Sequence, residues 1–267
     1  MTRARARSAP PPAGAGHCAP KVRIDQLLVE QGKAASRTEA QRLVMRGVVQ
    51  AAGQPVSKPG QRVAPDAPLA VQAGAPYVSR GGEKLAGALA AFGLPIRGRV
   101  AMDVGASTGG FTDCLLQRGA SRVYAIDVGY GQLAWSLRQD PRVIVKERTN
   151  IRTLPPSALP EPVDLVTADL SFISLRLVLP ALQPFLTATA DLLLLVKPQF
   201  EVGRRLVGRG GVVRDPMLQA AAVREVTAVA ESVGYRVKGC AASVLRGPKG
   251  NQEYFLWLGF EKGGYRQ

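Results

Sequence analysis

The stretch "RVAMDVGASTGGFTDCLLQRG", residues 99–119, combines an apolar run, a glycine-rich loop and the start of a second periodic segment. The run that ends near Val104 predicts a short buried strand, and the residues from Gly109 to Gly119 predict the helix that follows it. A glycine loop between strand and helix brings backbone N–H groups to a helix N-terminus, where an anionic group can bind. The stretch therefore predicts an α/β unit with a ligand site after its first strand.

Short apolar runs recur through the rest of this region and alternate with helical stretches. Strands are predicted within residues 122–129, 143–148, 163–170, 191–198, 236–245 and 252–260. Helices are predicted within residues 175–187 and 216–233. Near-continuous apolar strands separated by helices predict a doubly wound, Rossmann-like α/β sheet of seven mostly parallel strands, covered on both faces. The last two runs have no helix between them, so they predict a C-terminal antiparallel hairpin.

The run "DLLLLVKPQF", residues 191–200, allows three interpretations: a membrane-seeking segment, a buried strand, or a strand that carries a lysine to a reaction. Five consecutive apolar residues are far fewer than the roughly 20 that a membrane helix needs. A strand covered by helices explains the leucines, and Pro198 ends its ladder because proline has no N–H group. We therefore expect Lys197 at the carboxyl edge of the sheet.

The composition is strongly basic. The chain has 267 residues, a formal charge of +15 and 46% apolar residues, which suffices for a packed core. A polyanion, most often nucleic acid, is the partner that this charge favours, and an anionic membrane surface is the competing one. No stretch is long enough to span a membrane, and the basic N-terminus lacks the apolar region of a secretory signal.

Cysteine and histidine usage limits which disulfides, metal sites and catalytic groups the chain can have. The three cysteines are far apart and form no paired framework, so a reducing compartment is expected and the protein is predicted to be cytoplasmic. The single histidine, His17, lies in a low-complexity tail. A metal site and histidine catalysis are therefore not expected, and a proton must move through Lys, Asp, Glu or water.

Four segments are predicted from composition and pattern. They are a disordered basic tail at residues 1–20, a compact basic unit at 21–73, a linker at 74–80 and the α/β unit at 81–267. Residues 1–80 hold twelve Lys and Arg against four Asp and Glu, so charge density is highest at the front. A capping-box pattern, Ser36 with Glu39, begins the second helix of the basic unit. Its basic face is either simply solvated or binds RNA.

The run "RIDQLLVEQGKAASRTEAQRLVMRGVVQAAGQPV" resembles the S4 RNA-binding domain. The matching features include Arg23 with Asp25, Gly32, and Ser36 with Arg37. A second basic segment, "EVGRRLVGRGGVVRD" after Lys197, is either a surface loop or a flexible clamp for RNA phosphates. The candidate RNA-binding residues are Arg23, Ser36, Arg37, Gln41, Arg42, Arg46, Lys58, Arg80, Arg204, Arg205 and Arg209.

The glycine loop has the spacing D-x-G-x-x-x-G, which is neither a dinucleotide fingerprint nor a Walker A loop. It is typical of methyltransferases that use S-adenosylmethionine. Gly105 lets the backbone approach a cofactor closely, and Asp127, 24 positions after Asp103, is placed to accept ribose hydroxyls. The competing interpretation is an ordinary turn with structural glycines. The candidate cofactor residues are Asp103, Gly105, Ala106, Ser107, Thr108, Gly109, Gly110, Phe111, Asp127, Asn150 and Asp169.

Four ionisable residues stand out at strand ends or just after the linker: Lys84, Asp169, Lys197 and Glu253. Any one of them alone can mark no more than the edge of a core. Together they resemble the K-D-K-E tetrad of FtsJ/RrmJ-like ribose 2′-O-methyltransferases. With the S4 pattern in front, residues 21–262 resemble the TlyA (haemolysin A) family of rRNA cytidine-2′-O-methyltransferases, through "YVSRGGEKL", "DVGASTGGFTD", "DLSFISL", "LLVKPQFE" and "GPKGNQE".

The resemblance implies S-adenosylmethionine as cofactor and a cytidine of 16S or 23S rRNA as substrate. It also marks a departure, because Ala75 and Tyr77 stand where relatives carry R-x-W-V in the linker. Two alternatives remain at this point: a non-catalytic S4-type assembly factor, and a membrane-active haemolysin.

Lys197 is the predicted base of the tetrad. Desolvation by its apolar strand and the charge of Lys84 would both disfavour the charged form of Lys197, whereas Asp169 would favour it. We therefore expect Asp169 to orient Lys197 and to face the sulfonium. Glu253 is expected to pair with Lys84 and to hold the nucleotide.

Overall fold

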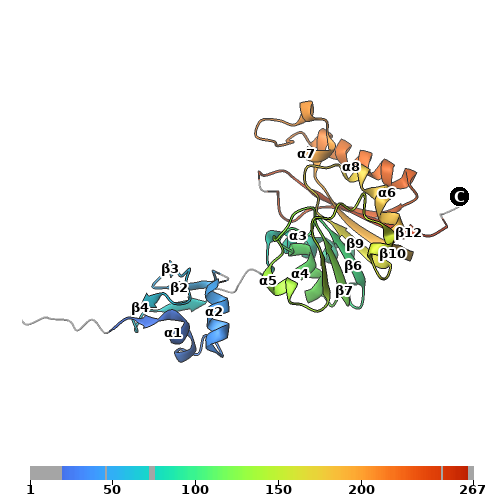
Figure 1. Cartoon of the computed structure of the whole chain (residues 1–267). Helices are drawn as coiled ribbons and strands as arrows, with labels where there is room; N and C mark the ends of the chain where they lie inside the picture. The colour runs from blue at the N-terminus through green and yellow to red at the C-terminus, as the bar shows by residue number, and fades with distance from the viewer. Residues whose placement is uncertain (1–19, 46, 72–75, 248, 264–267) are drawn as a thin grey trace, which may run out of the picture. The chain divides into compact units, whose positions relative to one another are not determined.

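The computed structural model describes residues 20–45, 47–71, 76–247 and 249–263. The chain divides into two compact units, Met1–Gly74 and Ala75–Gln267 (Figure 1). The predicted tail up to residue 19 and the linker residue Ala75 lie outside the described residues.

Two helices and short strands form the first unit. Helix α1 (Ile24–Glu30) and helix α2 (Arg37–Met45) pack on each other, and Ile24, Leu28 and Ala40 are fully buried between them and the strands. The predicted cap of α2 is present, because the backbone N–H of Glu39 donates to Ser36 Oγ at 3.2 Å. The strands are β1 (Val22–Arg23), β2 (Val49–Ala51), β3 (Gln54–Pro55), β4 (Arg62–Val63) and β5 (Leu69–Val71).

A seven-stranded sheet forms the centre of the second unit, in the order β11-β12-β10-β9-β6-β7-β8. The five strands from β10 to β8 are parallel, and β12 is antiparallel to both β10 and β11. This confirms the predicted mostly parallel sheet with its antiparallel hairpin. The strands are β6 (Val100–Val104), β7 (Arg122–Ile126), β8 (Val143–Lys146), β9 (Val163–Ala168), β10 (Leu186–Val196), β11 (Arg236–Ala242) and β12 (Tyr254–Glu261).

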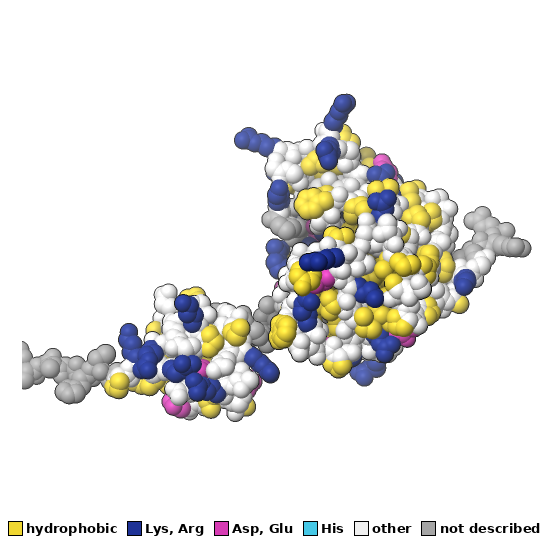
Figure 2. All heavy atoms as spheres, in the orientation of Figure 1, with side chains coloured by type: hydrophobic (Ala, Val, Ile, Leu, Met, Phe, Trp, Pro, Cys, Tyr) yellow, Lys and Arg dark blue, Asp and Glu magenta, His cyan; other side chains and the backbone are white. Residues whose placement is uncertain are grey.

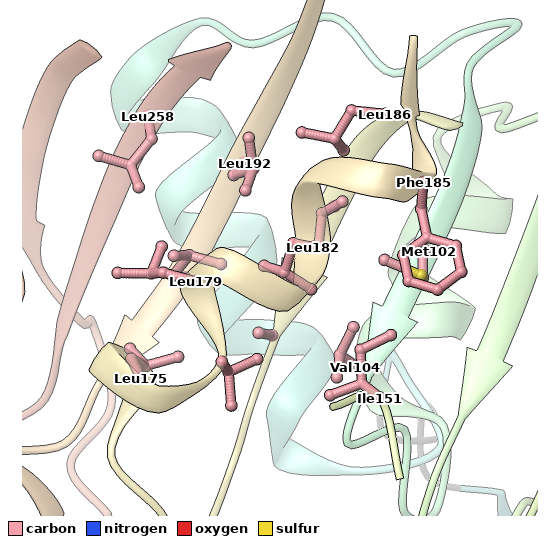
Figure 3. Packing of buried hydrophobic residues seen from close by; sticks show 14 of the residues in the cluster. Met102, Val104, Ile151, Leu175, Leu179, Leu182, Phe185, Leu186, Leu192 and Leu258 are labelled. Atoms are coloured by element: carbon pink, nitrogen blue, oxygen red, sulfur yellow. The ribbon is translucent and has the colours of Figure 1, made fainter. Parts of the chain in front are cut away.

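Helices cover both faces of this sheet (Figure 1). Residues of α3 (Arg80–Phe92), α4 (Gly110–Gln117) and α5 (Trp135–Arg138) belong to the apolar cluster on one face. Residues of α6 (Leu179–Leu182) and α8 (Pro216–Ser232) belong to the cluster on the other. Figure 3 shows Leu179 and Leu182 of α6 among the side chains of the second cluster.

The predicted helix over residues 175–187 was wrong as one element. The segment is broken into the 3₁₀ turn η2 (Leu175–Leu177), α6 and the 3₁₀ turn η3 (Gln183–Phe185), and β10 already begins at Leu186. Pro180 and Pro184 explain the interruption, because each lacks an N–H group and clashes with the preceding helical turn.

Strand β10 is the buried strand that the leucine run predicted. Residues 192–196 are at most 1% exposed, between β9 on one side and β12 on the other. The strand ends at Val196, and Pro198 opens the short helix α7 (Pro198–Glu201) as the first helical residue. Lys197 therefore leaves the sheet at its carboxyl edge, as predicted.

Candidate active site

Gly105 is the point where the loops after β6 and β9 meet. Its φ of +83° lies in the left-handed region, and a Cβ at this position would be 2.7 Å from the backbone oxygen of Asp169. Only glycine allows this approach. The loop is also tied to β7, because the N–H of Gly105 donates to Ile126 O at 2.8 Å. The glycine loop and the Asp169 loop thus form one continuous surface at the end of β6.

Two cavities adjoin at this surface and share Gly105, Ser107, Asp169 and Ser171. The first, of about 500 Å³, lies between the glycine loop and the start of α3. The second, of about 560 Å³, lies along the ends of β6, β7 and β9. Below, these are called the lysine cavity and the nucleoside cavity.

The nucleoside cavity combines apolar walls with a few polar groups. Asp127 lines it after β7, and its carboxylate accepts hydrogen bonds from the backbone N–H groups of Ser107 (2.7 Å) and Gly129 (2.6 Å). Asn150 also lines the cavity. Such a lining, mostly apolar with a few fixed polar groups, suits a flat heterocycle attached to a sugar. The apolar lining includes Val128, Ile151, Leu170, Phe172 and Ile173.

Asp103 lies near the end of β6, as the sequence predicted, but its side chain is fully buried. It lines neither cavity and accepts hydrogen bonds from the hydroxyls of Thr112 (2.7 Å) and Thr167 (3.1 Å). Burial raises the pKa of the Asp103 carboxyl to about 7. Contact between Asp103 and a cofactor stays a prediction, and the hydrogen bonds of its side chain join the end of β6 to α4 and β9. Gly109 also lies outside the lining of both cavities.

Lys197 and Asp169 meet in the lysine cavity, at the ends of adjacent strands. The Lys197 ammonium is 2.6 Å from Asp169 Oδ1, and its side chain is 11% exposed. The two groups are not aligned as a hydrogen bond, and Asp169 Oδ1 is a buried acceptor that receives none. Lys197 Nζ instead donates to Ser171 Oγ at 3.0 Å. Asp169 thus keeps an unfilled acceptor beside the glycine loop.

Lys84 and Glu253 form a second ion pair in this unit. Lys84 comes from the second turn of α3, Glu253 immediately precedes β12, and Nζ donates to Glu253 Oε2 at 2.6 Å. The two side chains are 9% and 1% exposed. Glu253 therefore compensates the positive charge of Lys84 within the site. Lys84 lines the lysine cavity together with Asp169 and Lys197.

The rim of the lysine cavity is basic. Arg80, a predicted RNA-binding residue, lines it at the start of α3 and donates to the backbone oxygen of Arg246 at 3.0 Å. Arg246 lines the cavity as well. The sequence reasoning missed Arg246 and Ser171. "DLSF" gave a signal for Ser171, because it places a hydroxyl two residues after Asp169.

In the first unit, three predicted RNA-binding side chains converge on one buried carboxylate. Asp25 is fully buried and accepts hydrogen bonds from Arg23 (2.9 and 3.0 Å), Arg37 (3.0 Å) and Gln41 (3.0 Å). The guanidinium of Arg23 holds the pKa of Asp25 well below its usual range. The sequence did not predict this network, in which the Arg37 side chain remains 51% exposed.

The remaining RNA-binding candidates are dispersed. Arg42 and Lys58 are exposed in the first unit, and Ser36 caps α2. Arg46 lies outside the described residues. The other three candidates, Arg204, Arg205 and Arg209, are exposed in the segment after α7 and line neither cavity. Figure 2 shows more basic than acidic side chains on the visible face of both units.

Sheet order, glycine loop and paired cavities together define a class I methyltransferase that uses S-adenosylmethionine, here in one chain with an S4 domain. The sequence model of the FtsJ-like methyltransferase matches residues 77–260, and that of the S4 domain matches residues 22–68. The 16S/23S rRNA (cytidine-2′-O)-methyltransferase TlyA of Mycobacterium tuberculosis is 54% identical over 240 residues, which cover 89% of this chain and 90% of that protein. The chain belongs to the TlyA family of FtsJ-like methyltransferases.

Solved structures agree with this assignment. A protein from Streptococcus thermophilus that carries the name hemolysin is 42% identical, with a TM-score of 0.70 over 92% of this chain and 90% of that one. An S-adenosylmethionine-dependent methyltransferase structure from Listeria monocytogenes shares the fold alone, at 12% identity and a TM-score of 0.52, over 69% of this chain and 100% of that one.

Two kinds of feature are absent from the residues that the structure describes. No helix among them is long and apolar enough to cross a membrane. No group of three or more His, Cys, Asp or Glu side chains among them is placed to hold a metal ion.

Proposed function

We propose that this protein transfers a methyl group from S-adenosylmethionine to the ribose 2′-oxygen of a cytidine in ribosomal RNA. The observation that carries the proposal is the convergence of Lys84, Asp169 and Lys197 on one cavity, next to a cavity suited to a nucleoside. The cytidine and the 16S and 23S rRNA targets follow the name of the Mycobacterium tuberculosis relative. A ribosomal substrate also supports a cytoplasmic location.

The residues present fit the cofactor. The nucleoside cavity offers Asp127 for the ribose hydroxyls and Asn150 for the adenine edge, beside apolar walls. The loop from Ala106 to Gly110 opens α4, whose N-terminal N–H groups suit the methionine carboxylate. The carboxylate of Asp169, which lines both cavities, suits a neighbouring positive charge. The bound cofactor supplies an electrophilic methyl group that already carries its leaving group.

Lys197 would accept the proton of the 2′-hydroxyl at Nζ. Its position at the end of a buried strand fixes the side chain, and a positioned base is worth about 10²- to 10⁴-fold in rate. Asp169 would attract the Lys197 side chain into the site through their close ion pair. Lys84, held by Glu253, would contact the target nucleotide from the opposite wall of the lysine cavity.

The RNA would be held by basic side chains outside the cavity. Arg80 and Arg246 line the rim, and Arg204, Arg205 and Arg209 follow α7 in an exposed segment. Phosphate contacts of this kind position a strand without reading its sequence. The S4 domain would supply a second, separate contact with the ribosomal RNA through Arg23, Arg37 and Arg42.

The test is methyl transfer from tritiated S-adenosylmethionine to ribosomal subunits that lack the modification, followed by mass mapping of 2′-O-methyl nucleotides. Lys197→Ala is expected to lower the rate by about 10²-fold or more, while Lys262→Ala, an exposed lysine at the other end of the sheet, should not change it. Methyl transfer by folded Lys197→Ala at the wild-type rate would exclude this lysine as base. RNA binding without any methyl transfer by the wild type would instead favour a non-catalytic assembly factor.

A further inference from the structure

Ser171 is the residue that gives Lys197 a defined direction. Within residues 76–247 and 249–263, it is the group that accepts a hydrogen bond from the Lys197 ammonium, at 3.0 Å. Asp169 is closer, at 2.6 Å, but its oxygen is not aligned for a hydrogen bond. An ion pair attracts without a preferred angle, whereas a hydrogen bond weakens steeply away from linearity. Asp169 therefore supplies the electrostatic attraction that holds the Lys197 ammonium, and Ser171 supplies its orientation.

Orientation matters because an amine base has one lone pair. In the neutral amine, a hydrogen bond to Ser171 would fix one N–H group and so restrict rotation about the Cε–Nζ bond. The remaining directions, including that of the lone pair, would then be set relative to the lysine cavity, which both residues line. When the 2′-hydroxyl is deprotonated, its O–H bond breaks and a new N–H bond forms at Nζ, along that lone pair.

The backbone around Ser171 is itself held in place. Four residues further along, the N–H of Leu175 donates to the carboxylate of Glu201 at 2.8 Å, and Glu201 is 3% exposed. Glu201 belongs to α7, which directly follows Lys197. The segment that carries Ser171 and the segment that carries Lys197 are thus joined behind the site, which keeps the donor and the acceptor at a constant separation.

We propose that Ser171 is a positioning residue for methyl transfer, which aims the lone pair of Lys197 at the ribose hydroxyl. The inference rests on the proposed function, in which Lys197 accepts the proton. Further ionisable groups face the same cavity or pair with a group that does, and none of them replaces the directional contact of the hydroxyl. They are Lys84, Arg80, Arg246 and Asp169, with Glu253 behind Lys84.

The experiment compares Ser171→Ala with Ser232→Ala, an exposed serine at the end of α8, in the full-length chain. Loss of a hydrogen bond to a charged group predicts that Ser171→Ala lowers kcat about 10- to 100-fold. The Kd for S-adenosylmethionine, measured by calorimetry, and the KM for the ribosomal substrate should stay within about twofold, because only the lone pair has lost its direction. Ser232→Ala should match the wild type.

A pair of conservative variants adds a readout that a merely structural role would not change. Should Ser171→Ala fail to fold, the nearly isosteric pair Ser171→Thr and Ser171→Val gives the same comparison, with the hydroxyl present only in the first.

The possible results separate this inference from the proposed function. An unchanged kcat in Ser171→Ala, or equal rates for the Thr and Val variants, would overturn the role of Ser171. So would a loss that appears only as weaker binding of S-adenosylmethionine. A wild-type protein that transfers no methyl group, or a fully active Lys197→Ala variant, would overturn the proposed function first.

Discussion

Asp103 lies at the end of β6 without exposed surface, and hydroxyls from α4 and β9 donate to its two oxygens. The side chain therefore joins the three elements on which the glycine loop is built. Burial raises the pKa of this carboxyl to about 7, from its ordinary value of 3.8. Between those two pH values the folded protein keeps a proton that the unfolded chain has released.

This difference predicts a pH-dependent stability. Because the folded-state pKa is raised, the contribution of Asp103 to stability is complete below about pH 4 and is lost as the pH rises through about 7. Asp103→Asn, which is always neutral, should lack this dependence. Thermal unfolding between pH 5 and pH 8 should therefore show a larger fall in Tm for the wild type than for the variant. Parallel curves for the two proteins would show that Asp103 does not titrate in this range.

Single residues also show how far the sequence could lead. Lys84, Asp169 and Lys197 were predicted as a group, and the structure brings them to one cavity with Glu253 bound to Lys84. This grouping was predictable because the carboxyl ends of parallel strands meet at one edge of the sheet. The sequence could not show which oxygen of a buried carboxylate is satisfied, so the hydrogen bonds of Asp103 and the hydrogen bond to Ser171 required coordinates.

At the level of elements, Glu201 of α7 connects two loops of the active site. Its carboxylate accepts from Ser174 Oγ at 2.5 Å and from the N–H of Leu175, and it pairs with Arg176. Burial raises the pKa of Glu201. The strands of the sheet were predictable from apolar runs. This connection was not, because it joins η2 to α7, two short segments whose contact no apolar pattern indicates.

Glu201 and Glu225 offer a matched comparison, since both pair with Arg176 but their side chains are 1% and 56% exposed. Glu201→Ala should lower the free energy of unfolding by about 1 to 3 kcal/mol, because it leaves the buried donors of Ser174 and Leu175 without their acceptor. Glu225→Ala should cost at most about 1 kcal/mol, as exposed ion pairs do. Denaturant unfolding measures both values. Equal costs would mean that Glu201 does not hold the two loops together.

For the whole molecule, RNA affinity and cofactor affinity should be separable at the S4 domain, because the first unit holds RNA-binding candidates and the cofactor candidates all lie in the second. Arg42 and Lys58 are the suitable test positions because both are exposed. Arg23 and Arg37 are less suitable, because both donate hydrogen bonds to the buried carboxylate of Asp25. Arg42→Gln with Lys58→Gln should weaken binding to ribosomal RNA. It should also reduce the slope of log affinity against log salt by roughly 2, one for each phosphate contact.

The control removes the same charge elsewhere. Arg224→Gln with Lys262→Gln alters two exposed positions of the second unit, on α8 and after β12, and should leave the salt slope unchanged. Calorimetry should give the same affinity for S-adenosylmethionine in both double variants. An equal effect of the two pairs on RNA binding would mean that total charge, rather than the S4 domain, attracts the RNA.

The pairing of Lys84 with Glu253 has a consequence for the timing of synthesis. The two residues are 169 positions apart, and β12, which follows Glu253, lies inside the sheet between β10 and β11. A nascent chain that stops before residue 253 has the glycine loop, Asp169 and Lys197, but it lacks the partner of Lys84 and a strand of the sheet. Translation must therefore pass residue 261 before the sheet and the pair of Lys84 with Glu253 can be complete.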